Sequence, residues 1–253
     1  MPDVPLRFPL EPAPRDATPD SPPSPPPAKS RGRRALRTLA RAVLAVLLGY
    51  YVACLVLLVV YRFAAPPITG VQLERRIEAA MEGRRYAMRR RFVPLTSMSP
   101  HLGRAVVAAE DGRFWSHWGY DLKEMRAAGK EALGGEGMRG ASTITQQLVK
   151  NLFGCTCRNP VRKIYDLALA LPAHLILGRE RVLELYLNTV EWGPGVFGAD
   201  AAARHHFGRR ARDLSRSQAA GLAALLPNPL KRTPRTTGEY REDILRRMES
   251  RGW

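Results

Sequence analysis

The sequence predicts a mainly α-helical protein in which a helical domain follows a single N-terminal transmembrane helix. Three observations support this fold class. Residues 42–61 carry no charged side chain, several later segments repeat apolar residues at helical spacing, and no stretch alternates apolar and polar residues over more than a few positions. The chain has 253 residues, of which 45% are hydrophobic, so it can form one domain of ordinary size with its own core.

Residues 1–41 form a proline-rich part and then a basic part. The first thirty residues hold eleven of the 21 prolines and cannot build a packed core, which predicts a disordered tail. A docking role for the PPSPPP run in extended polyproline form is the alternative. Basic side chains then gather close to the apolar stretch: Lys29, Arg31, Arg33, Arg34, Arg37 and Arg41.

Residues 42–61 are predicted to cross a membrane as a retained helix. Twenty residues at helical rise cover a bilayer core of about 30 Å. A cleavable signal peptide is the alternative, but the apolar run begins after residue 40 and no clear small-residue cleavage site follows it. Only Arg62 lies close on the other side before Arg75, so the basic cluster places the N-terminus in the cytoplasm and the following domain outside.

The net charge restricts the partners of this outer domain. The chain carries +17, and the residues after position 41 keep +13 of it. A domain this basic binds polyanions, and outside the membrane the polyanions within reach are lipid headgroups and lipid-linked phosphates. We therefore expect the membrane and a phosphate-bearing ligand as partners, and no nucleic acid.

The outer domain is predicted to begin with a juxtamembrane connector, residues 62–91. VQLERRIEAAMEGRR within it shows short helical periodicity, and YAMRRRFVPL is read as an extended piece. Ser99 and Pro100 then open a helix whose apolar face runs from Leu102 to Ala109. Its C-terminal end is where Glu110 emerges.

Residues 92–253 are predicted to form one helical domain. A glycine-rich segment at 134–140 reads as flexible, and Ser142 or Thr143 caps the helix that follows. Pro172 lies inside VRKIYDLALALPAHLILG and should kink or divide that helix. WGPGVFG reads as a glycine turn, and the remaining helices are predicted in RERVLELYLNTV, ADAAARHHFG and SRSQAAGLAALL.

Glu110 is the first candidate for chemistry. It follows an apolar run and precedes Phe114, Trp115, His117 and Trp118, and a carboxylate against apolar and aromatic surface has a raised pKa, suited to a general acid or base. A helix end turning into solvent is the ordinary alternative. His117 is a candidate base or metal ligand, or else a hydrogen-bonded structural residue.

Two further segments are candidates for binding an anion. One is the helix start with hydroxyl, amide and basic groups, where an ordinary cap is the alternative: Ser142, Thr143, Thr145, Gln146, Gln147, Lys150 and Asn151. The other places Arg162 and Lys163 four and three residues before Asp166, on one helix face, where a surface salt bridge is the alternative.

These segments together resemble a known family. EDGRFWSHWG, GASTITQQLVKNLF, RKIYD, RVLELYLN and GPGVFGADAAARHHFG, in this order and spacing, are similar to the five motifs of the bacterial peptidoglycan glycosyltransferases. The resemblance runs from about Phe92 to the C-terminus. With an N-terminal anchor and no room for a transpeptidase domain, the chain looks like the monofunctional members rather than the bifunctional penicillin-binding proteins.

The resemblance implies a lysozyme-like helical domain that polymerises lipid II on the periplasmic face of the bacterial inner membrane. The residue matching Glu110 is then the general base, and Asp166 is the second essential carboxylate. Lipid II and the growing glycan chain are the implied partners, with cell-wall synthesis or divisome proteins as further candidates. The implied substrate-binding residues are Asp111, Phe114, His117, Ser142, Thr143, Gln146, Gln147, Lys150, Asn151, Arg162 and Lys163.

Two positions depart from the family pattern. Asp166 stands where the family has glutamate, which shortens its reach by about 1.5 Å, and His174 occupies another acidic position of the same helix. No cofactor or protein-held metal is expected. The resemblance is also compatible with a divalent cation, Mg²⁺ or Mn²⁺, bound at the pyrophosphate. A catalytically weakened scaffold that binds lipid II or cell-wall synthesis partners, and a lytic hydrolase, are the alternative functions.

Overall fold

The computed structural model describes residues 29–134, 140, 142–157 and 159–253. The chain divides into two compact units, residues 1–47 and 48–253. Helices dominate the described residues, so the mainly α-helical prediction is confirmed. The expected disordered tail, as far as residue 28, and most of the glycine-rich segment at 134–140 lie outside the described residues.

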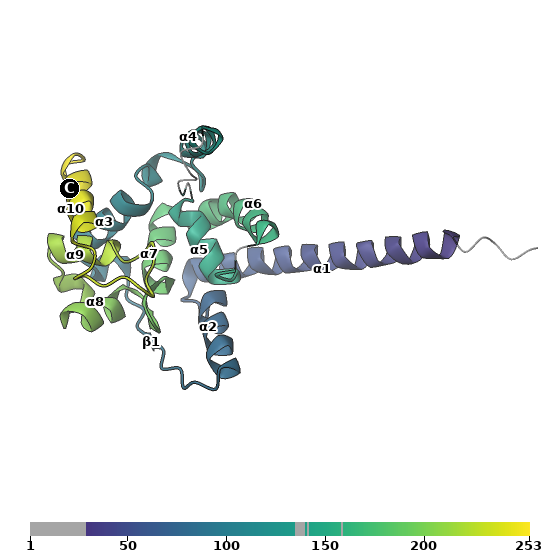
Figure 1. Cartoon of the computed structure of the whole chain (residues 1–253), viewed down its shortest axis with the longest axis horizontal. Helices are drawn as coiled ribbons and strands as arrows, with labels where there is room; N and C mark the ends of the chain where they lie inside the picture. The colour runs from purple at the N-terminus through teal and green to yellow at the C-terminus, as the bar shows by residue number, and fades with distance from the viewer. Residues whose placement is uncertain (1–28, 135–139, 141, 158) are drawn as a thin grey trace, which may run out of the picture. The chain divides into compact units, whose positions relative to one another are not determined.

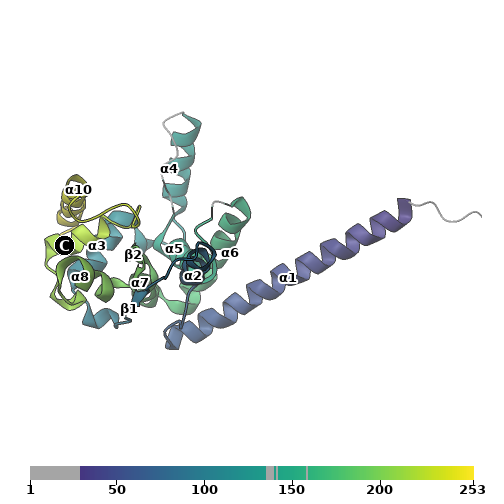
Figure 2. The ribbon, with the colours of Figure 1, turned by 60° about the horizontal axis from the view of Figure 1, so that its bottom comes forward.

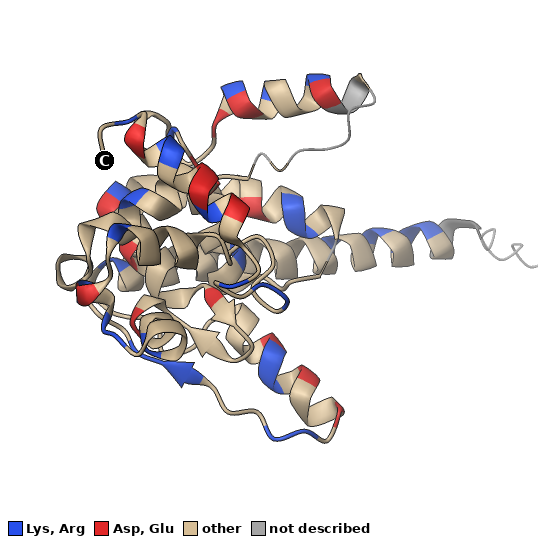
Figure 3. Cartoon of the chain, turned by 60° about the vertical axis from the view of Figure 1, so that its left-hand side comes forward, with Lys and Arg blue, Asp and Glu red and all other residues tan. Residues whose placement is uncertain are grey.

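The first helix, α1 (Lys29–Phe63), contains the predicted transmembrane segment. Residues Gly32–Phe63 are long and apolar enough to cross a membrane by length and composition. Basic residues mark the first turns of α1, and a stretch without Lys or Arg follows (Figure 3). Most large apolar side chains of this helix are exposed, from Leu36 to Val60, as a lipid-facing helix requires.

Within the unit 48–253, the last turns of α1 pack against α5 (Ile144–Phe153) and α6 (Pro160–Leu177). Leu58 is fully buried, and the Tyr61 and Phe153 rings stack with centroids 6.2 Å apart. Pro172 does not divide α6, so that part of the prediction is wrong. Because a proline has no N–H, the Ala168 carbonyl loses its helical donor, and the Tyr51 hydroxyl donates to it at 3.3 Å.

Two groups of helices build the domain (Figure 1). The first group holds the predicted helix that ends at Glu110: α3 (Pro100–Glu110), α9 (Arg216–Ala223) and α10 (Gly238–Glu249). The second group surrounds α5: α2 (Gly70–Met81), α6 and α7 (Arg179–Thr189). Large side chains between the elements are fully buried, among them Phe114, Tyr186, Trp192 and Phe197.

A small sheet ties the connector to the domain. β1 (Arg89–Arg90) pairs in parallel with β3 (Val196–Phe197), which pairs antiparallel with β2 (Glu191–Gly193). The extended piece and the glycine turn expected from the sequence are therefore confirmed, and together they form this sheet. Gly195 has φ +72 in the turn, a conformation that favours glycine. The buried Glu191 carboxylate accepts from Arg75 Nε at 3.1 Å, which also fixes α2.

Some elements were not predicted from the sequence. They include α4 (Leu122–Leu133), which projects from the rest of the domain (Figure 2), and α10 near the C-terminus. The described residues also contain α8 (Ala199–Phe207), predicted from its alanine-rich run, and short 3₁₀ helices at Leu95–Ser97, Phe114–Ser116 and Ala211–Asp213.

Gly119 provides a test of how tightly the loop after Glu110 is held. It has φ +92, and a Cβ there would lie 2.5 Å from the Ala170 carbonyl oxygen. We expect Gly119→Ala to lower the free energy of unfolding by about 2–4 kcal/mol. The new Cβ would strain the backbone at positive φ, and it would clash with the Ala170 carbonyl, which can move away only if the backbone shifts. Denaturant unfolding of the detergent-solubilised protein measures this change.

The matched control is Gly129→Ala inside α4. A Cβ at Gly129 meets nothing within 4 Å, so this change should be neutral or stabilising by up to about 1 kcal/mol. Equal effects of the two substitutions would contradict the close approach at Gly119.

Candidate active site

Glu110 is the last residue of α3 and lies where this helix meets α5. Val107 and Ala108 just before it are buried, and the Gln147 amide nitrogen donates to Glu110 Oε2 at 2.8 Å. Burial raises the pKa of the Glu110 carboxyl, although the Gln147 hydrogen bond and Lys150 oppose the shift. The predicted general base therefore has the desolvated setting that its sequence context indicated.

Gln147 is oriented by Tyr186, a residue that was not among the predicted site residues. The Tyr186 hydroxyl donates to Gln147 Oε1 at 2.8 Å, and the tyrosine is fully buried on α7. An ionised carboxylate can only accept hydrogen bonds, so the amide must turn its nitrogen toward Glu110 and its oxygen toward Tyr186. Tyr186 lies in the RVLELYLN motif, which is the signal that could have identified it.

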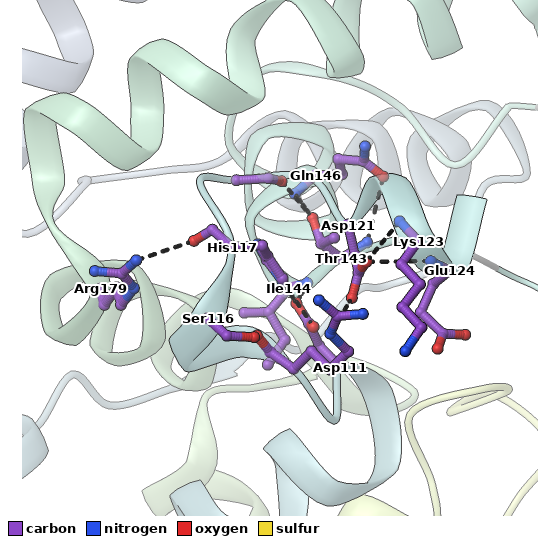
Figure 4. Close-up of polar contacts among 12 residues, drawn as sticks. Asp111, Ser116, His117, Asp121, Lys123, Glu124, Thr143, Ile144, Gln146 and Arg179 are labelled. Atoms are coloured by element: carbon purple, nitrogen blue, oxygen red, sulfur yellow. Dashed lines mark hydrogen bonds and ion pairs between the residues drawn. The ribbon is translucent and has the colours of Figure 1, made fainter. Parts of the chain in front are cut away.

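The N-terminus of α5 is anchored to the loop after Glu110 (Figure 4). Thr143, not Ser142, is the N-cap and forms a capping box with Gln146. Asp111 Oδ2 accepts from the Ile144 backbone N–H at 3.0 Å, and Asp111 Oδ1 lies 2.9 Å from His117 Nε2. These contacts fix the relative positions of the two segments that carry Glu110 and Gln147.

Several predicted substrate-binding residues have protein partners in this network. Thr143 Oγ1 donates to the Gly119 carbonyl at 2.6 Å, and Asn151 Nδ2 donates to the Gln147 carbonyl at 2.8 Å. Phe114 is fully buried against Trp115. Contact of these residues with substrate stays a prediction, as it does for Asp111, His117 and Gln146, whereas their structural role is visible here.

Three basic side chains gather on the α5 and α6 side of Glu110. Lys150 is half-buried, and burial, together with the nearby Arg162 guanidinium, lowers its pKa, although Asp166 and Glu110 oppose the shift. Lys163 Nζ donates to Ser142 Oγ at 2.6 Å, so the two predicted anion-binding segments are in direct contact.

Asp166 is buried on α6, and Arg162 forms an ion pair with it one turn away, as the spacing predicted. Burial raises the pKa of the Asp166 carboxyl, while Arg162, Lys150 and Lys163 oppose the shift. Despite the missing methylene, this carboxylate thus lies among the three cations.

His174, the second departure from the family pattern, lies away from this cluster. It packs against the loop after Glu110, with the Trp118 and His174 ring centroids 5.7 Å apart. Burial lowers the pKa of His174, and the positive charge of Arg179 adds to this shift, so the imidazole is neutral at neutral pH. Arg179 also donates to the His117 carbonyl at 3.2 Å (Figure 4).

A cavity of about 650 Å³ opens beside Glu110. The end of α3, the loop after it and the C-terminal helix α10 line this cavity, and its cationic lining residues were not predicted: Arg113, Arg247 and Arg251. Lys150, Arg162 and Lys163 do not line it. Glu110 therefore borders the cavity, and it also lies within the electrostatic influence of Lys150, a member of a separate group of cations.

The donor set does not fit a protein-held metal ion. Among the described residues, no group of three or more His, Cys, Asp or Glu side chains is placed to hold one. Asp166 is the one carboxylate in the basic cluster and is already paired with Arg162. The divalent cation considered from the sequence stays a prediction, and no chemical step is derived through it.

Comparison with known proteins establishes the family. The family model described as Transglycosylase matches residues 76–249, a range that includes part of the predicted connector. A biosynthetic peptidoglycan transglycosylase of Pseudomonas putida is 44% identical over 196 residues, which cover 78% of this chain and 83% of the relative. Proteins of the same name from Pseudomonas fluorescens and Ectopseudomonas mendocina are 45% and 43% identical, over 77% of this chain and 81% and 80% of theirs.

The chain therefore belongs to the transglycosylase family. The resemblance inferred from the five motifs is confirmed, and with it the assignment of the chain to the peptidoglycan glycosyltransferases.

Proposed function

We propose that this protein polymerises lipid II into glycan strands by inverting transfer, with Glu110 as the general base. The observation that supports this function best is the position of Glu110. Its half-buried carboxyl has a raised pKa, lines an open cavity and lies near Lys150, which belongs to the basic cluster with Arg162 and Lys163. In an inverting transfer, the attacking hydroxyl and the leaving group occupy opposite faces of the anomeric carbon, and this function assigns the acceptor to the cavity and the leaving group to the basic cluster.

The chemical step follows from this arrangement. The acceptor sugar enters the cavity and its 4-hydroxyl gives its proton to Glu110 while the oxygen attacks the anomeric carbon of the growing chain. The bond from that carbon to the polyprenyl pyrophosphate breaks, and the pyrophosphate leaves with the electron pair. Because this leaving group is a weak base, it needs charge neutralisation rather than protonation, and Lys150, Arg162 and Lys163 provide it.

Gln147 and Tyr186 act as positioning residues in this proposal. Gln147 holds Oε2 of Glu110, which leaves Oε1 to accept the proton of the incoming hydroxyl. Tyr186 prevents the amide from turning its oxygen toward the carboxylate. Asp166 has a complementary role, because its charge holds Arg162 in place for the pyrophosphate.

We further propose that α1 anchors the protein in the bacterial inner membrane, with the N-terminus in the cytoplasm and the catalytic domain in the periplasm. The basic cluster before the apolar stretch supports this orientation. A lipid-linked substrate is then held at the membrane surface from which the domain emerges. Cell-wall synthesis or divisome proteins are the proposed protein partners.

Glu110→Gln tests the role of the base. Gln removes the ionisable group and keeps the shape, so we expect glycan synthesis to fall by at least about 100-fold, the usual contribution of general base catalysis. Binding of lipid II should remain within a few-fold of wild type. Gel analysis of glycan chains made from labelled lipid II gives the rate, and a binding assay gives the affinity. Retained turnover would remove Glu110 from this role.

Asp166→Glu and Asp166→Asn test the shortened carboxylate. The isosteric Asn loses the charge that holds Arg162, so we expect it to slow polymerisation about tenfold or more, whereas Glu should keep or increase the wild-type rate. The same assay measures both variants. A wild-type protein that makes no glycan, beside an Asp166→Glu variant that does, would instead identify the natural chain as a lipid II-binding scaffold.

A further inference from the structure

The cavity beside Glu110 has a wall that the catalytic proposal does not use. This wall is formed by α10, which packs against α3 and α9, and by the turn that follows it. The helix contributes Tyr240 and Arg247, and the turn contributes Arg251. Arg113, three residues after Glu110, lines the cavity as well. Three arginine side chains therefore line the same cavity as the base, and arginine side chains bind anionic ligands.

Arg251 lies close to the segment that carries Glu110. A Cβ on Gly112 would lie 2.6 Å from Arg251 Nη2, so the guanidinium lies directly over the backbone two residues after the base. Its other terminal nitrogen, Nη1, donates to the Arg247 carbonyl at 2.8 Å, and the group lies 5.8 Å from the centroid of the Trp253 ring. These two contacts hold the charged group near the cavity.

The charges of the other two arginines are already paired. Arg113 Nε lies 3.4 Å from Asp121 Oδ2, and Arg247 Nη2 lies 2.6 Å from Asp243 Oδ2. Arg251 forms no ion pair with a carboxylate among the described residues. It is exposed, so its remaining donors are accessible to a ligand.

Four acids line the cavity, Glu110, Asp111, Asp121 and Glu124, and none of them forms an ion pair with Arg251 among the described residues. Asp111 accepts from Ile144 and contacts His117, as described above. Asp121 Oδ1 accepts from the backbone N–H groups of Lys123 and Glu124 at 3.0 and 3.1 Å, in addition to its pairing with Arg113 (Figure 4). Asp111 and Asp121 are therefore held by contacts that fix the loop after Glu110.

We propose that Arg251, held by the Arg247 carbonyl, binds an oxyanion of the incoming acceptor and thereby aligns the acceptor 4-hydroxyl with Glu110. This role rests on the proposed function, because it assigns the cavity to the acceptor. A guanidinium suits it, since its planar donors bind carboxylate and phosphate oxygens in pairs. Lipid II carries both groups, as stem-peptide carboxylates and as pyrophosphate, and the shared oxyanion chemistry is what the site recognises.

The test compares Arg251→Ala with Arg246→Ala. Arg246 is on α10, has a largely exposed side chain and does not line the cavity, so it is the matched control. A lipid-linked tetrasaccharide is supplied as donor at saturating concentration, and lipid II is varied as acceptor. Loss of a charge-assisted contact should raise the acceptor KM of Arg251→Ala about tenfold, with kcat within about twofold of wild type. Arg246→Ala should match wild type, and Arg251→Lys should fall between.

A second arm identifies the source of the oxyanion. It uses lipid II whose stem-peptide carboxylates are converted to amides. If the wild-type KM rises and the Arg251→Ala effect disappears, the site binds a peptide carboxylate. If the effect keeps its full size, the site binds the pyrophosphate. Either result supports the proposed oxyanion site.

An unchanged acceptor KM in a folded Arg251→Ala protein would overturn the proposal, as would an equal change in Arg246→Ala. Thermal unfolding of both variants establishes that they fold. Failure of the underlying function would look different, because the wild-type protein would then make no glycan from the tetrasaccharide donor and lipid II.

Discussion

The rest of the active site depends on one constraint, the burial of the Glu110 carboxyl where α3 meets α5. Burial raises the pKa of this group, and the Gln147 amide is its direct hydrogen-bond donor. Tyr186 sets the orientation of that amide from α7. The carboxyl is thus both desolvated and oriented, and these are the two properties that a general base needs at neutral pH.

The second requirement is that α3 and α5 keep their relative position. Asp111 provides it by accepting from the first turn of α5 and contacting His117, while Thr143 binds the Gly119 carbonyl. Many motif residues therefore act by placing the catalytic groups. The basic cluster on α5 and α6 and the arginine-lined cavity are separate neighbours of this fixed base, which permits one region to take the leaving group and the other the acceptor.

Much of this architecture could be predicted from the sequence, because periodicity, caps and motifs are local signals. The helix ending at Glu110, the cap at the start of α5 and the pairing of Arg162 with Asp166 all follow from spacing within a few residues. Contacts between distant segments could not be predicted in this way. Tyr186 contacts Gln147 across 39 positions, Arg251 lies over the Gly112 backbone from the turn after a helix that was not predicted, and Tyr51 donates to the carbonyl that Pro172 leaves without a helical donor.

The pH dependence of stability in wild type and Glu110→Gln shows whether the fold holds Glu110 against ionisation. A carboxyl whose pKa is raised in the folded state costs no stability below its unfolded pKa, and its destabilising effect develops as the pH rises through the folded pKa. Denaturant unfolding should therefore show Glu110→Gln more stable than wild type at pH 7, with the gap closing below about pH 4. A gap that is absent, or that does not change with pH, would mean that folding does not oppose ionisation of Glu110.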